Sequence, residues 1–172
     1  APPHARGEDL FYLGWCHGPV GTARLFHLLF EATGDPEWSL WEERCGGALV
    51  ESGLPVQRTP GFWNNVGQCC GSAGVAGFFL DRHAETGDAE ALAFALAMCD
   101  DLFARGTRAE DGLSWVQAEH RLRPELLQAQ TGHMQGAAGI GLLFLHVDGA
   151  LRGRERGIRL PDDPHGGLQE KP

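Results

Sequence analysis

The sequence predicts an all-α protein in which inner and outer helices repeat along the chain. Residues 14–38 and 67–91 align without a gap, so that Cys16 matches Cys69 at an offset of 53 residues. A third copy at 132–150 keeps a Gly-x-x-Gly pair and the apolar run after it. Such a period is typical of α/α repeat proteins, whose helical hairpins bury their apolar faces against their neighbours. The pattern leaves open a partial (α/α) toroid or a solenoid.

Each copy begins with a Gly-rich turn and continues as an apolar helix. We expect these inner helices at Val20–Ala32, Val75–Glu85 and Ala137–Asp148. Hydrophobic residues surround most of their circumference, which predicts that each is buried on more than one side. Thr-Gly-Asp follows the first two, and there Asp35 and Asp88 are expected to cap a second helix.

The second helix has a different pattern, because its apolar residues form one stripe among acidic ones. That pattern predicts an outer helix. The stripe contains Leu92, Leu96, Cys99 and Phe103. Residues 52–65 indicate a loop, and 112–132 alternate like a short strand or extended arm, on which we expect Gln117 and Glu119 to be solvated.

Length and composition indicate one folded domain with an acidic surface. The chain has 172 residues, and we expect residues 1–150 to form the domain and 151–172 to be a disordered tail. The formal charge of −9 and the lack of a basic stripe argue against nucleic acid or an anionic membrane as partner. No apolar run approaches the ~20 residues of a membrane span. Five cysteines, two of them adjacent, favour a reducing, cytoplasmic compartment.

Three cysteines occupy equivalent turns of neighbouring repeats. Cys16, Cys69 and Cys70 could therefore converge, and three protein ligands with one open position are typical of a catalytic zinc site. Helix N-termini also favour thiolates. The alternative is a set of small buried cysteines in tight turns, but their repeat-equivalent positions favour metal.

These motifs resemble a known family. Trp15-Cys16-His17-Gly18 and, about 50 residues on, Cys69-Cys70-Gly71 are similar to the C-terminal part of the lanthionine synthetase C-like family, over roughly residues 10–150. The resemblance implies part of an (α/α)₇ toroid with Zn²⁺ bound by Cys16, Cys69 and Cys70. Cys70 stands where most members carry His, as in the three-Cys subgroup. The family resemblance also implies a function in lanthipeptide biosynthesis, in which a thioether ring is closed in a dehydrated, Cys-containing precursor peptide.

The resemblance assigns further expectations to single residues and to the whole chain. His17 is the candidate catalytic acid, although it could instead only hydrogen-bond a ligand thiolate, and His133 could line the same cavity. About three inner helices match, so we expect either the C-terminal part of a longer enzyme or a reduced relative, with self-association or an upstream domain at the open edge. The alternative function is a non-catalytic module that binds zinc and a small thiol, such as glutathione, or a partner's Cys.

Overall fold

The structure is a computed structural model that describes residues 11–57, 62–63, 65–110, 112–120, 123–154 and 158. Within these ranges it contains five helices, α1 (Pro19–Thr33), α2 (Pro36–Glu51), α3 (Ser72–Thr86), α4 (Ala89–Arg105) and α5 (Ala137–Leu151). The strands of the same ranges are β1 (Phe11–Tyr12), β2 (Phe62–Trp63), β3 (Thr107–Ala109), β4 (Gly112–Ser114), β5 (Val116–His120) and β6 (Arg123–Ala129). Most of the predicted tail, 151–172, lies outside the described residues.

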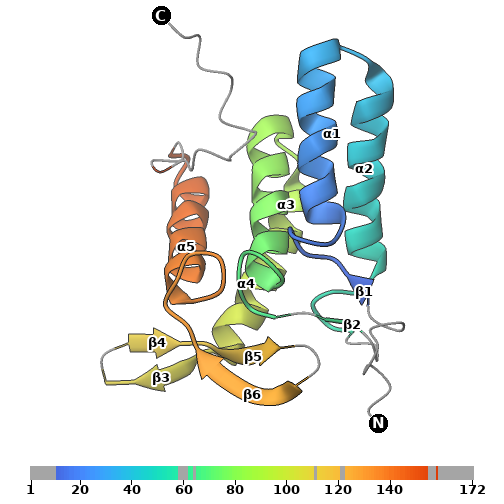
Figure 1. Cartoon of the computed structure of the whole chain (residues 1–172). Coiled ribbons are helices and arrows are strands. Elements are labelled where there is room, and N and C mark those ends of the chain that lie inside the picture. The colour runs from blue at the N-terminus through green and yellow to red at the C-terminus, as the bar shows by residue number, and fades with distance from the viewer. Residues whose placement is uncertain are drawn as a thin grey trace, which may run out of the picture.

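The helices follow the predicted alternation of inner and outer positions. Helices α1, α3 and α5 lie in a row, while α2 packs against α1 and α4 packs against α3 (Figure 1). Helix α5 pairs with no outer helix among the residues that the structure describes. The chain is thus helix-rich with two inner–outer hairpins and a third inner helix, and closure into a toroid stays a prediction.

The all-α prediction is wrong in one respect, because three small two-stranded sheets are present. Strands β1 and β2 pair in parallel, whereas β3–β4 and β5–β6 are antiparallel hairpins. Strands β4, β5 and β6 fall within residues 112–132, the segment predicted as a short strand or arm, and β3 precedes it. Trp115 between them is buried, and its indole Nε1 donates a hydrogen bond of 2.7 Å to the Leu102 carbonyl of α4. The hairpins are therefore attached to the outer helix of the second repeat.

The predicted turns between inner and outer helices are confirmed. The Asp35 carboxylate accepts a hydrogen bond from the Glu37 amide at 3.0 Å, and Asp88 accepts one from Glu90 at 2.8 Å. Gly34 precedes the first cap with a φ of 68°, in the left-handed region that favours glycine. The Thr-Gly-Asp signal therefore ends one helix and begins the next.

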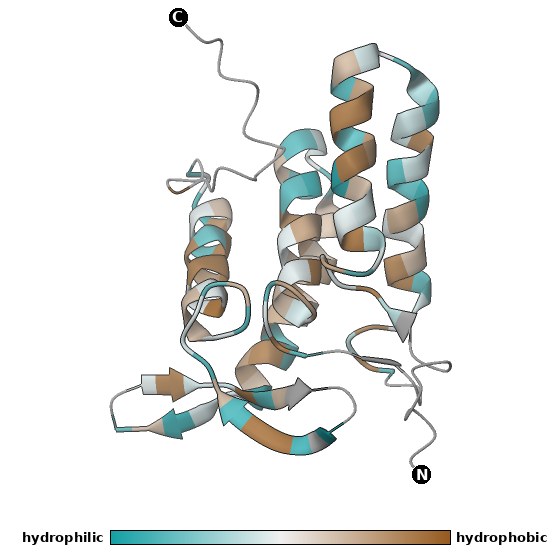
Figure 2. Ribbon diagram, in the orientation of Figure 1, coloured by the Kyte–Doolittle hydropathy of each residue, from teal (hydrophilic) through white to brown (hydrophobic). Residues whose placement is uncertain are grey.

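The middle inner helix, α3, is much more deeply buried than the first one, α1. Nine residues of α3 are buried, whereas α1 buries only Val20 and Ala23. Leu25 and Leu28 of α1 are 54% and 43% exposed, although the helix is as apolar as predicted (Figure 2). The prediction of burial on more than one side is right for α3 and wrong for α1, because α1 has an inner neighbour, α3, on one side only among the described elements.

The buried line on α4 also differs from the predicted stripe. Cys99 is buried as predicted, whereas the other buried residues each precede a predicted position, and Leu92 and Leu96 are only partly buried. These other buried residues are Ala91, Ala95, Met98 and Leu102. Phe103 is 49% exposed and lies beneath the Arg108 guanidinium, 5.0 Å from its carbon. The alanines let α4 approach α3 closely, and larger residues of the predicted stripe are left at the margin.

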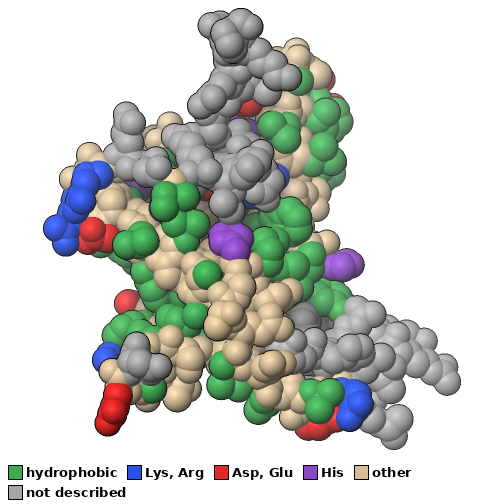
Figure 3. All heavy atoms as spheres, turned by 60° about the vertical axis from the view of Figure 1, so that its left-hand side comes forward, with side chains coloured by type: hydrophobic (Ala, Val, Ile, Leu, Met, Phe, Trp, Pro, Cys, Tyr) green, Lys and Arg blue, Asp and Glu red, His purple; other side chains and the backbone are tan. Residues whose placement is uncertain are grey.

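Helix α5 has an exposed apolar side as well. Leu145 and Leu151 are 67% and 59% exposed, and the view of Figure 3 shows hydrophobic side chains on the face that carries α5. Self-association through such a surface stays a prediction. None of the helices that the structure describes is long and apolar enough to cross a membrane.

Candidate metal centre

Three loops, one before each inner helix, are hydrogen-bonded in series. The Cys69 carbonyl in the second loop accepts hydrogen bonds from the amides of Trp15, at 2.8 Å, and Cys16, at 3.2 Å. The Cys69 amide in turn donates to the Met134 carbonyl of the third loop at 2.9 Å. Cys69 thus joins the first loop to the third through its own peptide groups.

Equivalent glycines fix the spacing between these loops. A Cβ on Gly14 would lie 2.8 Å from the Cys69 carbonyl oxygen, and a Cβ on Gly67 would lie 2.7 Å from that of Met134. Real Cβ atoms essentially never come so close. The backbones of successive loops therefore pack directly on one another, with glycine required at the contact.

A second set of glycines folds each loop over the start of its helix. A Cβ on any of them would overlap the carbonyl oxygen of the residue six positions earlier. The pairs are Gly21 with Trp15, Gly74 with Gln68, and Gly139 with His133. The same offset in all three repeats confirms that the Gly-rich turn is a repeated structure, and that its glycines permit close backbone approach.

The stacked loops bring the three predicted ligands together. Cys16 Sγ lies 2.9 Å from Cys70 Sγ, and Cys70 Sγ lies 3.4 Å from Cys69 Sγ. All three sulfurs are within 4.8 Å of one another. Thiolates that bind one zinc ion tetrahedrally at about 2.3 Å lie about 3.8 Å apart, so small side-chain shifts would accommodate the ion. The donor set of three half-buried thiols fits a metal.

The other cysteines do not belong to this group. All five cysteines of the chain are free. Cys45 lies on α2, and Cys99 is buried in α4, where burial first, and the nearby Asp100 charge second, raise the pKa of the thiol to about 12. Cys99 therefore behaves as a small core residue.

The three clustered thiols differ in how readily they ionise. Burial opposes ionisation of Cys16, but hydrogen bonds with Cys70, His17 and Cys69 outweigh it and lower the pKa of this thiol. Burial, followed by the hydrogen bond with Cys16, raises the pKa of both Cys69 and Cys70. The cluster thus stabilises one thiolate on Cys16 and resists a second one unless a cation compensates for the charge.

His17 lies at the rim of this cluster. Its side chain is exposed, and its ring centroid is 5.3 Å from that of Tyr12. It lies near enough to Cys16 to contribute to the lowered pKa of that thiol. The position allows both predicted roles, proton transfer and support of a ligand thiolate.

Gln117 was expected to be solvated, and this expectation is wrong. It is 5% exposed, its Nε2 donates to the Gln135 carbonyl at 2.7 Å, and its Oε1 accepts from the Val66 amide at 3.4 Å. Gln117 therefore connects the second loop to the third by hydrogen bonds. The alternation along the arm did place it on one face, but gave no signal that this face is covered. The Glu119 side chain lies outside the described part.

Replacing Gln117 with methionine is expected to lower the free energy of unfolding by about 1–3 kcal/mol, because buried polar partners lose their hydrogen bonds. Urea denaturation of the two proteins measures the change. The exposed Gln128→Met variant of β6 is the control and should shift it by less than about 0.5 kcal/mol. Equal shifts in both variants would contradict the buried role.

A cavity of about 90 Å³ lies beside the loops, between the inner helices. His133 lines it together with Trp15 of the first loop and Gln68 of the second. The clustered thiols are not among the residues that line it, so a cavity shared by His133 and the thiols stays a prediction. Arg24, Asp81 and His146 add polar groups to its wall. No sequence motif distinguishes these three residues, since they lie within helices whose apolar residues dominate the pattern.

A comparison with models of protein families shows to which family the chain belongs. The sequence model described as "Lanthionine synthetase C-like protein" matches residues 3–96, more than half of the chain. The chain belongs to this family. In this LanC-like chain the match extends from before α1 into the first half of α4 and includes all three clustered cysteines, whereas the third loop and α5 follow it. A search of the curated proteins found no match.

Proposed function

We propose that this LanC-like chain binds one zinc ion through Cys16, Cys69 and Cys70, as a three-Cys variant corresponding to the C-terminal part of the family's toroid. The convergence of the three sulfurs within 4.8 Å carries the proposal. When bound, zinc would make a substrate thiol nucleophilic by favouring its thiolate. Three protein ligands leave one position for that thiol.

The function that this site supports best is closure of a thioether ring in a dehydrated precursor peptide. The Cys sulfur of the peptide forms a bond to the β-carbon of a dehydroalanine or dehydrobutyrine residue, and the carbon–carbon double bond is lost. The α-carbon takes up one proton, which balances the proton released by the thiol. Substrate and product therefore have the same mass.

His17 is the proposed donor of that proton. A histidine changes charge near neutral pH and can both release and recover a proton. Its exposed position beside Cys16 leaves it accessible to a peptide that approaches the thiols.

The test is incubation of the zinc-loaded protein with a dehydrated, Cys-containing peptide. We expect the free thiol to disappear at unchanged mass, as measured by alkylation and mass spectrometry. A peptide that stays fully alkylatable after prolonged incubation would contradict the cyclase function.

His17→Gln is expected to slow ring closure by roughly 10²-fold, the contribution of a general acid, while zinc content is unchanged. Initial rates of the two proteins at matched zinc content measure this effect. His83→Gln on α3 is the control, because His83 contacts the Asp88 carbonyl and lies in another part of the fold. A wild-type rate in His17→Gln would contradict the acid role.

A second candidate is a non-catalytic module that binds zinc and a small thiol, such as glutathione, or a partner's Cys. The convergence of the three thiols supports it as well, since three protein ligands with one open position can bind zinc and a small thiol without further catalytic groups. Binding of glutathione to the zinc-loaded protein without ring closure in the peptide assay would support this module and contradict the cyclase.

The remaining assignments are part of the same proposal. Residues 1–150 would act as one LanC-like unit in the cytoplasm, where thiols stay reduced. Its partner would be the precursor peptide or a small thiol, with self-association or an upstream domain as further contacts.

A further inference from the structure

Cys16 and Cys70, two of the three clustered thiols, are placed so that they could also form a covalent bond with each other. Their Sγ atoms are 2.9 Å apart. That separation lies between the about 2.05 Å of a disulfide bond and the about 3.8 Å between two thiolates on one zinc ion. Both side chains are half-buried, so small reactants reach them from solvent. Side-chain movements of similar size would therefore produce either a disulfide or a zinc site.

The backbones of these two residues lie side by side, as a disulfide requires. The Cys16 amide donates a hydrogen bond of 3.2 Å to the Cys69 carbonyl, which belongs to the peptide group that leads into Cys70. A Cβ on Gly14 would lie 2.9 Å from Cys70 Cα, so the first loop packs directly on the second at this position. The bond can therefore form with little movement of either loop, since widely separated Cα atoms cannot be bridged in this way.

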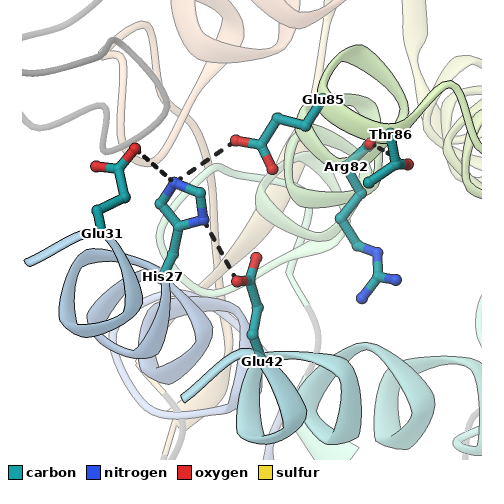
Figure 4. Close-up of polar contacts among 6 residues, drawn as sticks. All are labelled: His27, Glu31, Glu42, Arg82, Glu85 and Thr86. Carbon is teal, nitrogen blue, oxygen red and sulfur yellow. Dashed lines mark hydrogen bonds and ion pairs between the residues drawn. The ribbon is translucent and has the colours of Figure 1, made fainter. Parts of the chain in front are cut away.

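Contacts that do not involve the thiols also hold the first and second loops in place. These loops lead into α1 and α3. His27 of α1 lies 3.3 Å from Glu42 of α2 and 3.6 Å from Glu85 of α3 (Figure 4). The contacts are ion pairs when the imidazole is protonated, and they join α1 to α3 away from the loops. The position of the cysteine pair therefore has support that does not involve a metal.

The adjacent pair, Cys69 and Cys70, is less suited to a disulfide, although its sulfurs are 3.4 Å apart. Neighbouring Cα atoms across a trans peptide are about 3.8 Å apart, which is below the roughly 4.4–6.8 Å usual for a disulfide. The peptide group between these two residues also accepts the hydrogen bonds from Trp15 and Cys16. A bond between the neighbours would distort this peptide group, which favours Cys16 as the partner of Cys70.

We propose that Cys16 and Cys70 form a reversible disulfide that competes with zinc, so that the thiol centre is sensitive to a peroxide. The two thiols lose two electrons and two protons, and one S–S bond forms. Hydrogen peroxide takes up these electrons and protons, its O–O bond breaks, and two water molecules result. In the zinc-loaded chain, where the sulfurs are thiolates, the two protons come from solvent.

The disulfide removes two of the three ligands from the zinc ion. Cys69 alone then binds zinc far more weakly, so the ion is released. Two molecules of glutathione reverse the reaction, because they restore both thiols and are themselves joined as a disulfide. This effect on zinc rests on the proposed zinc site, whereas formation of the disulfide does not.

The test is treatment of the metal-free full chain with hydrogen peroxide, followed by alkylation, digestion without reductant and mass spectrometry. We expect two peptides joined through Cys16 and Cys70, a chain mass lower by two hydrogen atoms, and return of both thiols after addition of glutathione. A disulfide that contains Cys69, a disulfide between two chains, or cysteines that only gain oxygen would overturn the proposal. Because this assay needs no zinc, its failure is distinguished from failure of the proposed function.

Zinc release is measured on the loaded chain with a coloured zinc indicator during the same peroxide treatment. We expect one zinc ion to be released for each disulfide formed, and zinc to bind again after reduction with glutathione. Zinc that stays bound to a chain carrying the disulfide would overturn the competition between them.

Variants identify the bonded pair. Cys69→Ala should form the disulfide in the same yield as the wild type although it does not hold zinc, whereas Cys70→Ala should lower the yield at least 10-fold. Cys45→Ala on α2 is the matched control and should behave as the wild type in both assays. Circular dichroism checks that the variants are folded. An unchanged yield in folded Cys70→Ala, or loss of the bond in folded Cys69→Ala, would overturn the assignment.

Discussion

Cys69→Ala and Cys70→Ala are each expected to lower the zinc content from about one ion per chain to nearly none. Each change leaves two thiols, and two protein thiolates bind zinc far more weakly than three. Metal analysis of protein purified and then dialysed against a weak chelator measures the result. Ring closure of the peptide substrate should be lost together with the metal.

Two further variants test whether the loss of zinc is specific to removal of a ligand from the cluster. Cys45→Ala on α2 is the control, because Cys45 does not belong to the cluster, and it should retain zinc. Cys70→His should also retain zinc, since an imidazole replaces the thiolate as a donor. The site then carries one negative charge fewer, which leaves less electron density on a bound substrate sulfur. Full zinc retention in both alanine variants would contradict the assignment.

The sequence predicted the parts of the site that the repeat makes visible. The offset of 53 residues identified equivalent turns, and the structure places Cys16, Cys69 and Cys70 together because those turns stack. The helix caps could also be predicted, since Asp88 forms a local hydrogen bond only two residues away, with Glu90. Both features could be predicted because the contacting residues are either close in sequence or at equivalent positions of the repeat.

Contacts between elements without a repeat could not be predicted in this way. Gln117 and Val66 are 51 residues apart and share no motif. His27 and Glu85 come from different helices, where each looks like one more charged position on an amphipathic face. The exposure of Leu25 depends on which element covers α1, and hydrophobicity alone does not specify that element. These features needed the arrangement of the helices in space.

Gly139→Ala is expected to destabilise the protein by about 3 kcal/mol or more, because the new Cβ would overlap the His133 carbonyl oxygen and lie 2.8 Å from Gln68 Cγ. The third loop would have to move away from its helix. For a chain of this size, that loss corresponds to a decrease in Tm of roughly 6–12 °C. Thermal unfolding followed by circular dichroism measures it.

Gly141→Ala, two residues later in the same helix, provides the matched control. No atom lies within 4 Å of its added Cβ, so alanine should stabilise α5 by about 0.5–1 kcal/mol through its helix propensity. The changes in stability have opposite signs because of position alone, since both substitutions add the same methyl group. Similar Tm values for the two variants would show that the Gly-rich turn does not need the close backbone approach. In that case the stacked loops, and the thiol positions that depend on them, would need another explanation.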